Sequence, residues 1–112
     1  MDSKGHVPAD PMEFIRLCAA ERRILWTYHV NMRMKGRGIP RGVIIGAVDS
    51  YEIIEEYPGD KYMPSYLIWM KANGEVYHVL FALDVEGNNV RVVTAYRPDP
   101  AGWDGSLKKR RR

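Results

Sequence analysis

The dipeptide Asn73-Gly74 constrains the fold of this chain most strongly, because it lies between two runs of residues that favour β-strands. Asn-Gly is the preferred pair for a two-residue hairpin turn, in which both residues need a positive φ. Residues 65–71 before the pair are rich in aromatic and branched side chains, and residues 75–83 continue in the same way. The sequence therefore predicts an antiparallel β-hairpin.

Two more strands are predicted, one on each side of the hairpin. Residues 51–57 include Ile53 and Ile54 and end at the turn 58–60, and residues 90–97 follow a turn at 86–89. Since short turns join these strands, we expect an antiparallel meander of about four strands.

Two helices are predicted before the sheet. Asp10 is suited to cap a helix and Pro11 to occupy its first position, so a long helix is expected over 11–35. A glycine-containing turn at 36–38 ends it, and a shorter helix is expected over 40–49. The long helix carries one apolar stripe, made of Phe14, Leu17, Cys18, Leu25, Tyr28 and Met32. The predicted fold class is α+β, with two N-terminal helices packed on one sheet face.

The 112 residues are 46% hydrophobic and 28% charged, which is typical of a globular domain. We expect a flexible N-terminal arm at 1–10, a single α+β domain at 11–104 and a basic disordered tail at 105–112. No apolar run is long enough to span a membrane, and no secretory leader opens the sequence, so a cytoplasmic protein is expected.

The sequence contains no motif for a metal or a bound cofactor. Cys18 is the single cysteine, which excludes an intramolecular disulfide and a cysteine-based metal cluster, and its place on the apolar stripe indicates a core residue. No phosphate-binding glycine loop, dinucleotide fingerprint or helical pair of histidines occurs. We therefore expect no cofactor and no metal.

The charge is distributed unevenly, although the net charge is only +3. Residues 16–41 hold seven basic side chains and one acidic one, residues 43–104 hold four basic and ten acidic ones, and residues 108–112 are all basic. Two basic blocks therefore flank an acidic one. This layout favours a polyanion on one surface and a basic protein on another, although a solvated arginine-rich helix face would have the same composition.

The predicted long helix places Arg22, Trp26, His29 and Arg33 within a sector of about 60°, on the flank of the apolar stripe. A titratable imidazole one helical turn from a fixed guanidinium suits proton transfer at a phosphate. The alternative is structural, in which His29 covers the edge of the core and Arg33 pairs with an acidic residue of the sheet.

The predicted strands supply the other candidates. His78 lies in an otherwise apolar strand, so it is either a hydrogen-bonded core histidine or a site residue on a rigid element. Tyr96 suits stacking on an RNA base, or is an ordinary half-buried aromatic residue. Glu55 and Glu56 are adjacent in a strand and point apart, which indicates solubilising charge. Trp103 is expected to anchor the C-terminus.

Five groups of residues, in the expected order, make the chain resemble a known bacterial and archaeal family. They are His29, Arg33 and Arg37-Gly38-Ile39; Glu55-Glu56-Tyr57; Pro64-Ser65; Tyr77-His78-Val79; and Val92-Val93-Thr94-Ala95-Tyr96 with Pro98 and Trp103. From about residue 25 to 104 the sequence resembles the domain-of-unknown-function family four-two-five-eight, which is itself considered similar to the RelE/BrnT/MqsR-like toxins.

The resemblance implies a RelE/BrnT-like fold and the toxin component of a toxin–antitoxin system. The implied activity is metal-independent cleavage of mRNA, free or on the ribosome, inhibited by a cognate antitoxin that often carries a YgiT-type zinc finger. The family's two histidines and two arginines correspond to His29, His78, Arg33 and Arg37, and its terminal tyrosine corresponds to Tyr96.

Such cleavage requires a base for the ribose 2′-hydroxyl, cations for the phosphate and an acid for the leaving oxygen. The predicted catalytic residues are His29, His78, Arg33 and Tyr96, and the predicted RNA- and phosphate-binding residues are Arg22, Arg37, Arg97, Lys108 and Arg110. The alternatives are a non-catalytic module that binds nucleic acid or a protein, and a structural protein whose histidines lie in the core. The enzyme hypothesis requires both histidines and Arg33 to converge in one open site.

Overall fold

A computed structural model describes residues 7–111 of the chain. Within these residues it contains three α-helices, one 3₁₀ helix and five strands, so the mixed α+β class is confirmed. In chain order the elements are α1 (Pro11–Ala20), β1 (Ile24–Leu25), α2 (Tyr28–Gly36), α3 (Arg41–Gly46), the 3₁₀ helix η1 (Val48–Ser50), β2 (Glu52–Tyr57), β3 (Ser65–Ala72), β4 (Glu75–Asp84) and β5 (Asn89–Tyr96).

The strands form one sheet in the order β1-β5-β4-β3-β2. Strands β2 to β5 are the predicted antiparallel meander. The turn between β3 and β4 has a positive φ at both Asn73 (52°) and Gly74 (81°), as the hairpin prediction required. The described sheet has five strands rather than about four, because the short strand β1 pairs parallel with the start of β5.

The prediction of one long helix over 11–35 is wrong, because the chain leaves α1 after Ala20 and joins the sheet. The Arg23 carbonyl accepts a hydrogen bond from the Val90 amide at 3.1 Å, and the Arg23 side chain donates to the Asn88 carbonyl at 2.8 Å. These contacts with residues far away in the sequence stabilise β1 where local spacing favoured a continued helix.

The second helix, α2, begins where the Thr27 hydroxyl accepts a hydrogen bond from the Val30 amide at 3.2 Å. Because the helix is interrupted, the predicted apolar stripe is also wrong. The buried helix residues are Ile15, Cys18 and Ala19 in α1 and Val30 and Met34 in α2, whereas Leu17, Leu25, Tyr28 and Met32 are exposed. Cys18 is a core residue, as predicted.

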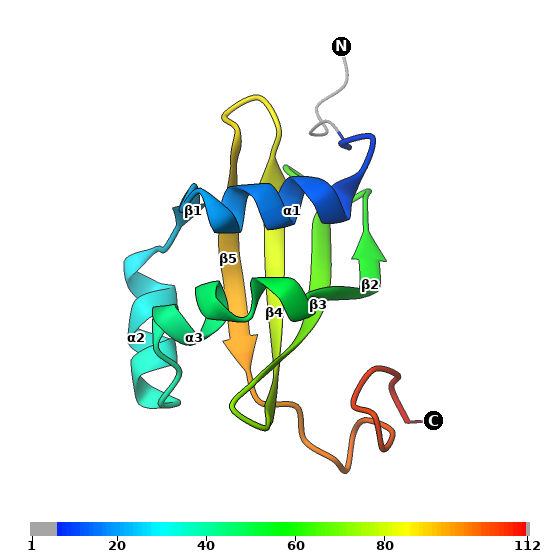
Figure 1. Cartoon of the computed structure of the whole chain (residues 1–112). Helices are drawn as coiled ribbons and strands as arrows, with labels where there is room; N and C mark the ends of the chain where they lie inside the picture. Colours follow the sequence, from blue (N-terminus) through cyan, green and yellow to red (C-terminus); the bar gives the residue numbers. More distant parts are fainter. Residues whose placement is uncertain (1–6, 112) are drawn as a thin grey trace.

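Helices α1 and α3 cover one face of the sheet, and α2 packs beside β5 (Figure 1). The core lies between these layers, and its sheet residues include Tyr66, Ile68, Met70, Val79 and Phe81. Side chains alternate along a strand, so the residues between these point to the opposite side. We call that side the open face; it carries Ser65, Leu67 and Trp69 from β3 and His78, Leu80 and Ala82 from β4.

The tail predicted to be disordered from residue 105 is folded against the sheet as far as residue 111. We call residues 98–111 the C-terminal segment, which leaves β5 and runs toward the β2 side of the sheet (Figure 1). Lys108 Nζ lies 2.9 Å from the Glu52 carboxylate, and Arg110 donates to both oxygens of Glu55 at 2.7 and 3.1 Å. Acidic β2 therefore attracts the basic tail, and Trp103 is buried as the predicted anchor.

The predicted start of the first helix and the predicted helix over 40–49 are both present in the structure. The Asp10 side chain caps α1 by accepting a hydrogen bond from the Glu13 amide at 3.1 Å. The helix predicted over 40–49 is present as α3 followed by η1. Residues 1–6 of the predicted arm, and residue 112, lie outside the described residues. No helix within residues 7–111 has the length and apolar character needed to cross a membrane.

Candidate functional site

The exposed imidazole of His29 lies in the first turn of α2, one helical turn before Arg33. Arg33 Nε donates a hydrogen bond to His29 Nε2 at 3.0 Å. A guanidinium has no acceptor, so His29 Nε2 is the acceptor of this hydrogen bond. The predicted pairing of the two side chains on one helix face is therefore present, whereas the structural alternative expected an acidic partner for Arg33.

A groove of about 650 Å³ lies beside His29 on the open face. Its walls come from the start of α2, the loop before β3 and the ends of β3, β4 and β5. Two cations, Lys61 and Arg91, and one carboxylate, Asp60, line it. The Tyr62 ring is 73% exposed, and Lys61 Nζ lies 5.2 Å from its centroid. The groove thus combines an imidazole, cations and an exposed aromatic ring.

The second predicted histidine, His78, is fully buried on the open face beneath the C-terminal segment. Its Nε2 lies 2.6 Å from the Leu107 carbonyl, which accepts, so Nε2 carries a proton. In the neutral imidazole Nδ1 then accepts from the Tyr96 hydroxyl at 3.3 Å. The Trp103 ring packs edge-on against the imidazole at a centroid distance of 4.5 Å. Burial lowers the pKa of His78, although the Leu107 carbonyl opposes this effect.

A carboxylate completes the surroundings of His78. Glu55 accepts hydrogen bonds from Arg110 and from the Tyr57 hydroxyl. The hydrogen bond from Arg110 lowers the pKa of Glu55, and partial burial opposes it. Glu55 is close enough for its charge to raise the pKa of His78. We call Glu55, Tyr57, His78 and Tyr96 the sheet cluster.

The predicted phosphate ligands Arg37 and Arg97 hold the backbone at the other end of α2. Arg37 donates to the Ala95 carbonyl at 2.8 Å, and Arg97 donates to the carbonyls of Arg37 at 2.6 Å and Gly38 at 3.2 Å. Arg97 also lies 3.3 Å from the Glu75 carboxylate. Both guanidinium groups therefore tie the α2–α3 loop to the end of β5.

The remaining predicted phosphate ligands are dispersed. Arg22 lies in the turn after α1 with a positive φ of 61°, so it is outside the helical sector predicted for it beside His29 and Arg33. Trp26 has left that sector too and lies under the Arg41 guanidinium, 5.1 Å from the ring centroid. Lys108 and Arg110 are paired with the acidic residues of β2.

The enzyme hypothesis required the two histidines and Arg33 to converge in one open site. In the structure they do not converge. His29 is exposed at the groove, whereas His78 is enclosed by the C-terminal segment. The groove residue Ala82 follows His78 by four positions on β4, which corresponds to roughly 13 Å along the strand. The groove and the sheet cluster are therefore separate parts of the same sheet face.

Sequence reasoning interpreted Glu55 as solubilising charge and did not single out Lys61, Tyr62 or Arg91. The spacing of Glu55 and Tyr57, two residues apart in one strand, was a usable signal that they share a face. Lys61 and Tyr62 had no such signal, because they join the groove only when the loop before β3 meets α2.

Among residues 7–111, no three His, Cys, Asp or Glu side chains are grouped as metal ligands would be.

Comparisons with known proteins identify a family for most of the chain. No curated protein and no solved structure matches the chain. Residues 26–97, from just before α2 to just after β5, match the family model described as Domain of unknown function (DUF4258), and the chain therefore belongs to this family.

Proposed function

We propose that the chain binds single-stranded RNA in the groove beside His29 and, when the enclosed His78 on the same sheet face becomes accessible, acts as a metal-independent mRNA endonuclease, the toxin of a toxin–antitoxin pair. The observation that supports this most is the composition of the groove. Lys61 and Arg91 offer positive charge to phosphates, and the exposed Tyr62 ring offers a surface on which a base can stack.

The size and openness of the groove also suit RNA. About 650 Å³ lies within the usual range of roughly 300–1,000 Å³ for ligand sites. RNA recognition in single strands relies on unstacked bases, aromatic side chains and backbone cations, all of which a groove of this kind accommodates.

In this proposal the RNA is cleaved by attack of a ribose 2′-hydroxyl on the adjacent phosphate. The proposal also includes the similarity of the family to the RelE/BrnT/MqsR-like toxins. Imidazole transfers protons near neutral pH, and guanidinium stabilises the added charge on the phosphate. His29, with Arg33 hydrogen-bonded to it, is the accessible imidazole, and His78 is the enclosed one. The cognate antitoxin is the proposed inhibitor.

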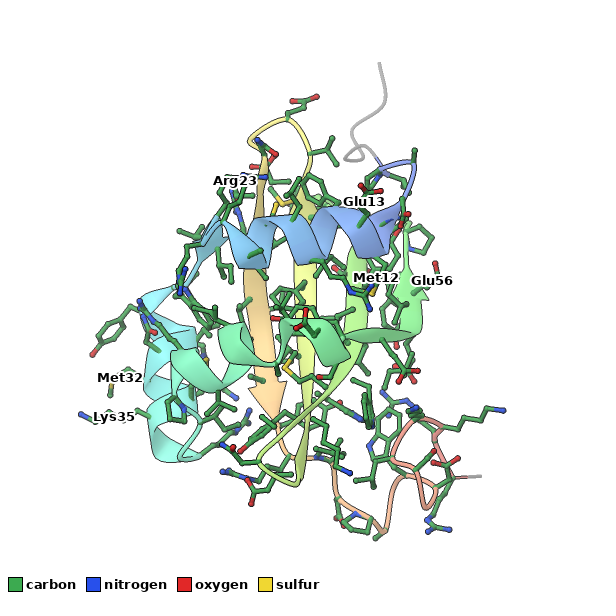
Figure 2. The ribbon with its side chains drawn as sticks, in the orientation of Figure 1. Met12, Glu13, Arg23, Met32, Lys35 and Glu56 are labelled. Atoms are coloured by element: carbon green, nitrogen blue, oxygen red, sulfur yellow. The ribbon has the colours of Figure 1, made fainter. Side chains whose placement is uncertain are left out.

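The outer side of α2 supports a protein partner of this kind. Tyr28 is 80% exposed and Met32 51% exposed, and Met32 and Lys35 point away from the sheet (Figure 2). Apolar side chains beside Arg33 and Lys35 suit an antitoxin segment that combines apolar and acidic residues.

A second candidate function is a binding module without catalysis. The burial of His78, with both ring nitrogens hydrogen-bonded, favours it. The two candidates differ in one outcome, because a binding module leaves bound RNA intact.

The test uses purified full-length protein and a short fluorescent single-stranded RNA. Binding is followed by anisotropy across a salt series, and cleavage is followed on denaturing gels. Arg91→Ala and Lys61→Ala are expected to weaken binding and to reduce the salt slope by about 0.7 each. Lys35→Ala, which removes a cation from the same protein outside the groove, is the matched control and is expected to leave binding unchanged.

Cleavage is tested with alanine at both His29 and His78. Loss of cleavage with retained binding supports the endonuclease, and intact RNA with the unaltered protein supports the binding module. Equal binding by the unaltered protein and Arg91→Ala would show that the groove is not the RNA site.

A further inference from the structure

We propose that the C-terminal segment is a displaceable cover over the sheet cluster, and that Glu55 and His78 in the uncovered cluster are the base and the acid of RNA cleavage. This inference rests on the proposed function for its substrate and adds Glu55, the chemical roles and the cover. RNA held in the groove reaches the cluster along the open face, past Leu80.

The cluster brings together the groups that such cleavage needs. His78 and Tyr96 are directly paired across β4 and β5, so their side chains share the open face. Glu55 reaches the same face from β2, where a register shift follows Ile53. A carboxylate, an imidazole and a phenol therefore gather on rigid strands in one interacting group.

The C-terminal segment makes hydrogen bonds to the atoms of this cluster that would react. The Leu107 carbonyl holds His78 Nε2 at 2.6 Å, and Arg110 holds both oxygens of Glu55. The Trp103 ring covers the imidazole. The fully buried imidazole of His78 is out of reach of a substrate while the cover is in place.

The attachments of the cover are of a kind that can be exchanged. The backbone-to-backbone hydrogen bonds of the segment join its own residues, for example the Asp104 amide to the Lys109 carbonyl at 2.8 Å and the Arg111 amide to the Gly102 carbonyl at 3.0 Å. Each of its contacts with the sheet involves a side chain: the Ser106 and Leu107 carbonyls accept from the side chains of Trp69 and His78, and Lys108 and Arg110 pair with carboxylates of β2. The Arg110 side chain is 60% exposed. The segment also lies beyond residue 97, where the family match ends.

Charge explains what displaces the cover. Lys108 and Arg110 pair with carboxylates of β2, and the phosphates of RNA compete for the same cations. RNA that binds these two side chains therefore releases Glu55 and uncovers His78. The predicted contacts of Lys108 and Arg110 with RNA phosphates would thus displace the C-terminal segment from the sheet cluster.

The uncovered cluster then cleaves the RNA by two proton transfers. The Glu55 carboxylate takes the proton of the ribose 2′-hydroxyl, and the 2′ oxygen forms a bond to phosphorus. The bond from phosphorus to the 5′ oxygen breaks, and the imidazolium of His78 gives that oxygen its proton. The products are a 2′,3′-cyclic phosphate and a 5′-hydroxyl end. Tyr96 is a positioning residue that holds His78 through Nδ1.

The experiment opens the cover in the full-length protein with the double substitution Lys108→Ala and Arg110→Ala. Lys109→Ala is the matched control, because it removes a tail charge that makes neither ion pair. Exposure of His78 is measured by its rate of modification with diethyl pyrocarbonate and by NMR titration, and cleavage is measured with the same RNA. Circular dichroism confirms folding, and Arg110→Gln alone serves as a milder second variant.

We expect at least tenfold faster modification of His78 in the double variant and a pKa closer to its ordinary value, since burial lowers it in the covered state. Glu55, Tyr96 and Arg110 are the titratable groups facing this imidazole, so the titration is repeated with Glu55→Gln. Cleavage is expected to rise in the double variant and to be lost when Glu55→Gln is added.

The outcomes separate this inference from the proposed function. Equal protection of His78 in all variants overturns the cover, whether or not RNA is cleaved. An exposed His78 with RNA bound but uncleaved overturns the roles of Glu55 and His78 and leaves groove binding intact. Absence of RNA binding by every variant overturns the proposed function, while the exposure of His78 still decides whether the segment is a cover.

Discussion

Removal of the Tyr51 hydroxyl tests how the short helix α3 is held on the sheet. Tyr51 is fully buried, and its hydroxyl donates to the Ile44 carbonyl at 2.7 Å. Ile44 lies in the last turn of α3, where backbone carbonyls have no partner within the helix. Tyr51→Phe keeps the ring, which packs against Phe81 at a centroid distance of 5.9 Å, and removes only this hydrogen bond.

The magnitude follows from burial. A hydrogen-bonded pair contributes about 0.5–1.5 kcal/mol, and a buried acceptor left without a partner raises the loss to about 1–3 kcal/mol. With a urea m-value of about 1–3 kcal/mol/M, the midpoint of unfolding should fall by roughly 1 M. Urea unfolding followed by tryptophan fluorescence measures this shift directly.

Tyr57→Phe is the control, because it removes the same atom from a different environment. The Tyr57 hydroxyl donates to Glu55, and the side chain is 39% exposed, so water can replace the lost bond. We expect the free energy of unfolding to change by less than about 0.5 kcal/mol. If Tyr51→Phe unfolds at the same urea concentration as the unaltered protein, or if both variants lose equally, the Tyr51 hydroxyl does not stabilise α3 as argued.

Three further predictions concern stability and accessibility. Because burial lowers the pKa of His78 in the folded protein, the unfolded chain binds a proton first as the pH drops. The free energy of unfolding should therefore fall as the pH drops from about 6.5 toward the folded-state pKa of His78. Urea unfolding at pH 5 and 7 measures this dependence, and His78→Asn should flatten it. Gly74→Ala places a side chain at a φ of 81° and should destabilise the hairpin by about 1–2 kcal/mol, whereas Gly36→Ala, at a position with open space and an ordinary φ, should not lower the melting temperature. The Cys18 thiol is fully buried and burial raises its pKa, so it should react with a disulfide reagent much more slowly in the native protein than in concentrated urea; equal rates would contradict the packing of α1.

The sequence by itself determined those parts of the fold whose chemistry is local. Asn73-Gly74 supplies two residues that tolerate positive φ, and the strands beside it alternate with a period of two, so the hairpin and the meander could be predicted. Asp10 and Pro11 likewise determined where α1 begins. His29 and Arg33 are one turn apart within a helix, so their contact was also predictable.

The tertiary structure alone decided the features that depend on contacts between distant residues. The spacing of apolar residues over 11–35 suggested one helix, but pairing of Arg23 with Val90 across the sheet interrupts it. The burial of His78 depends on Leu107 and Trp103 folding back over β4, and the ion pair between Glu55 and Arg110 forms because the same segment reaches β2. Periodicity reports which side of an element is apolar but not which distant segment covers it, because that choice depends on the competing contacts of the whole folded chain.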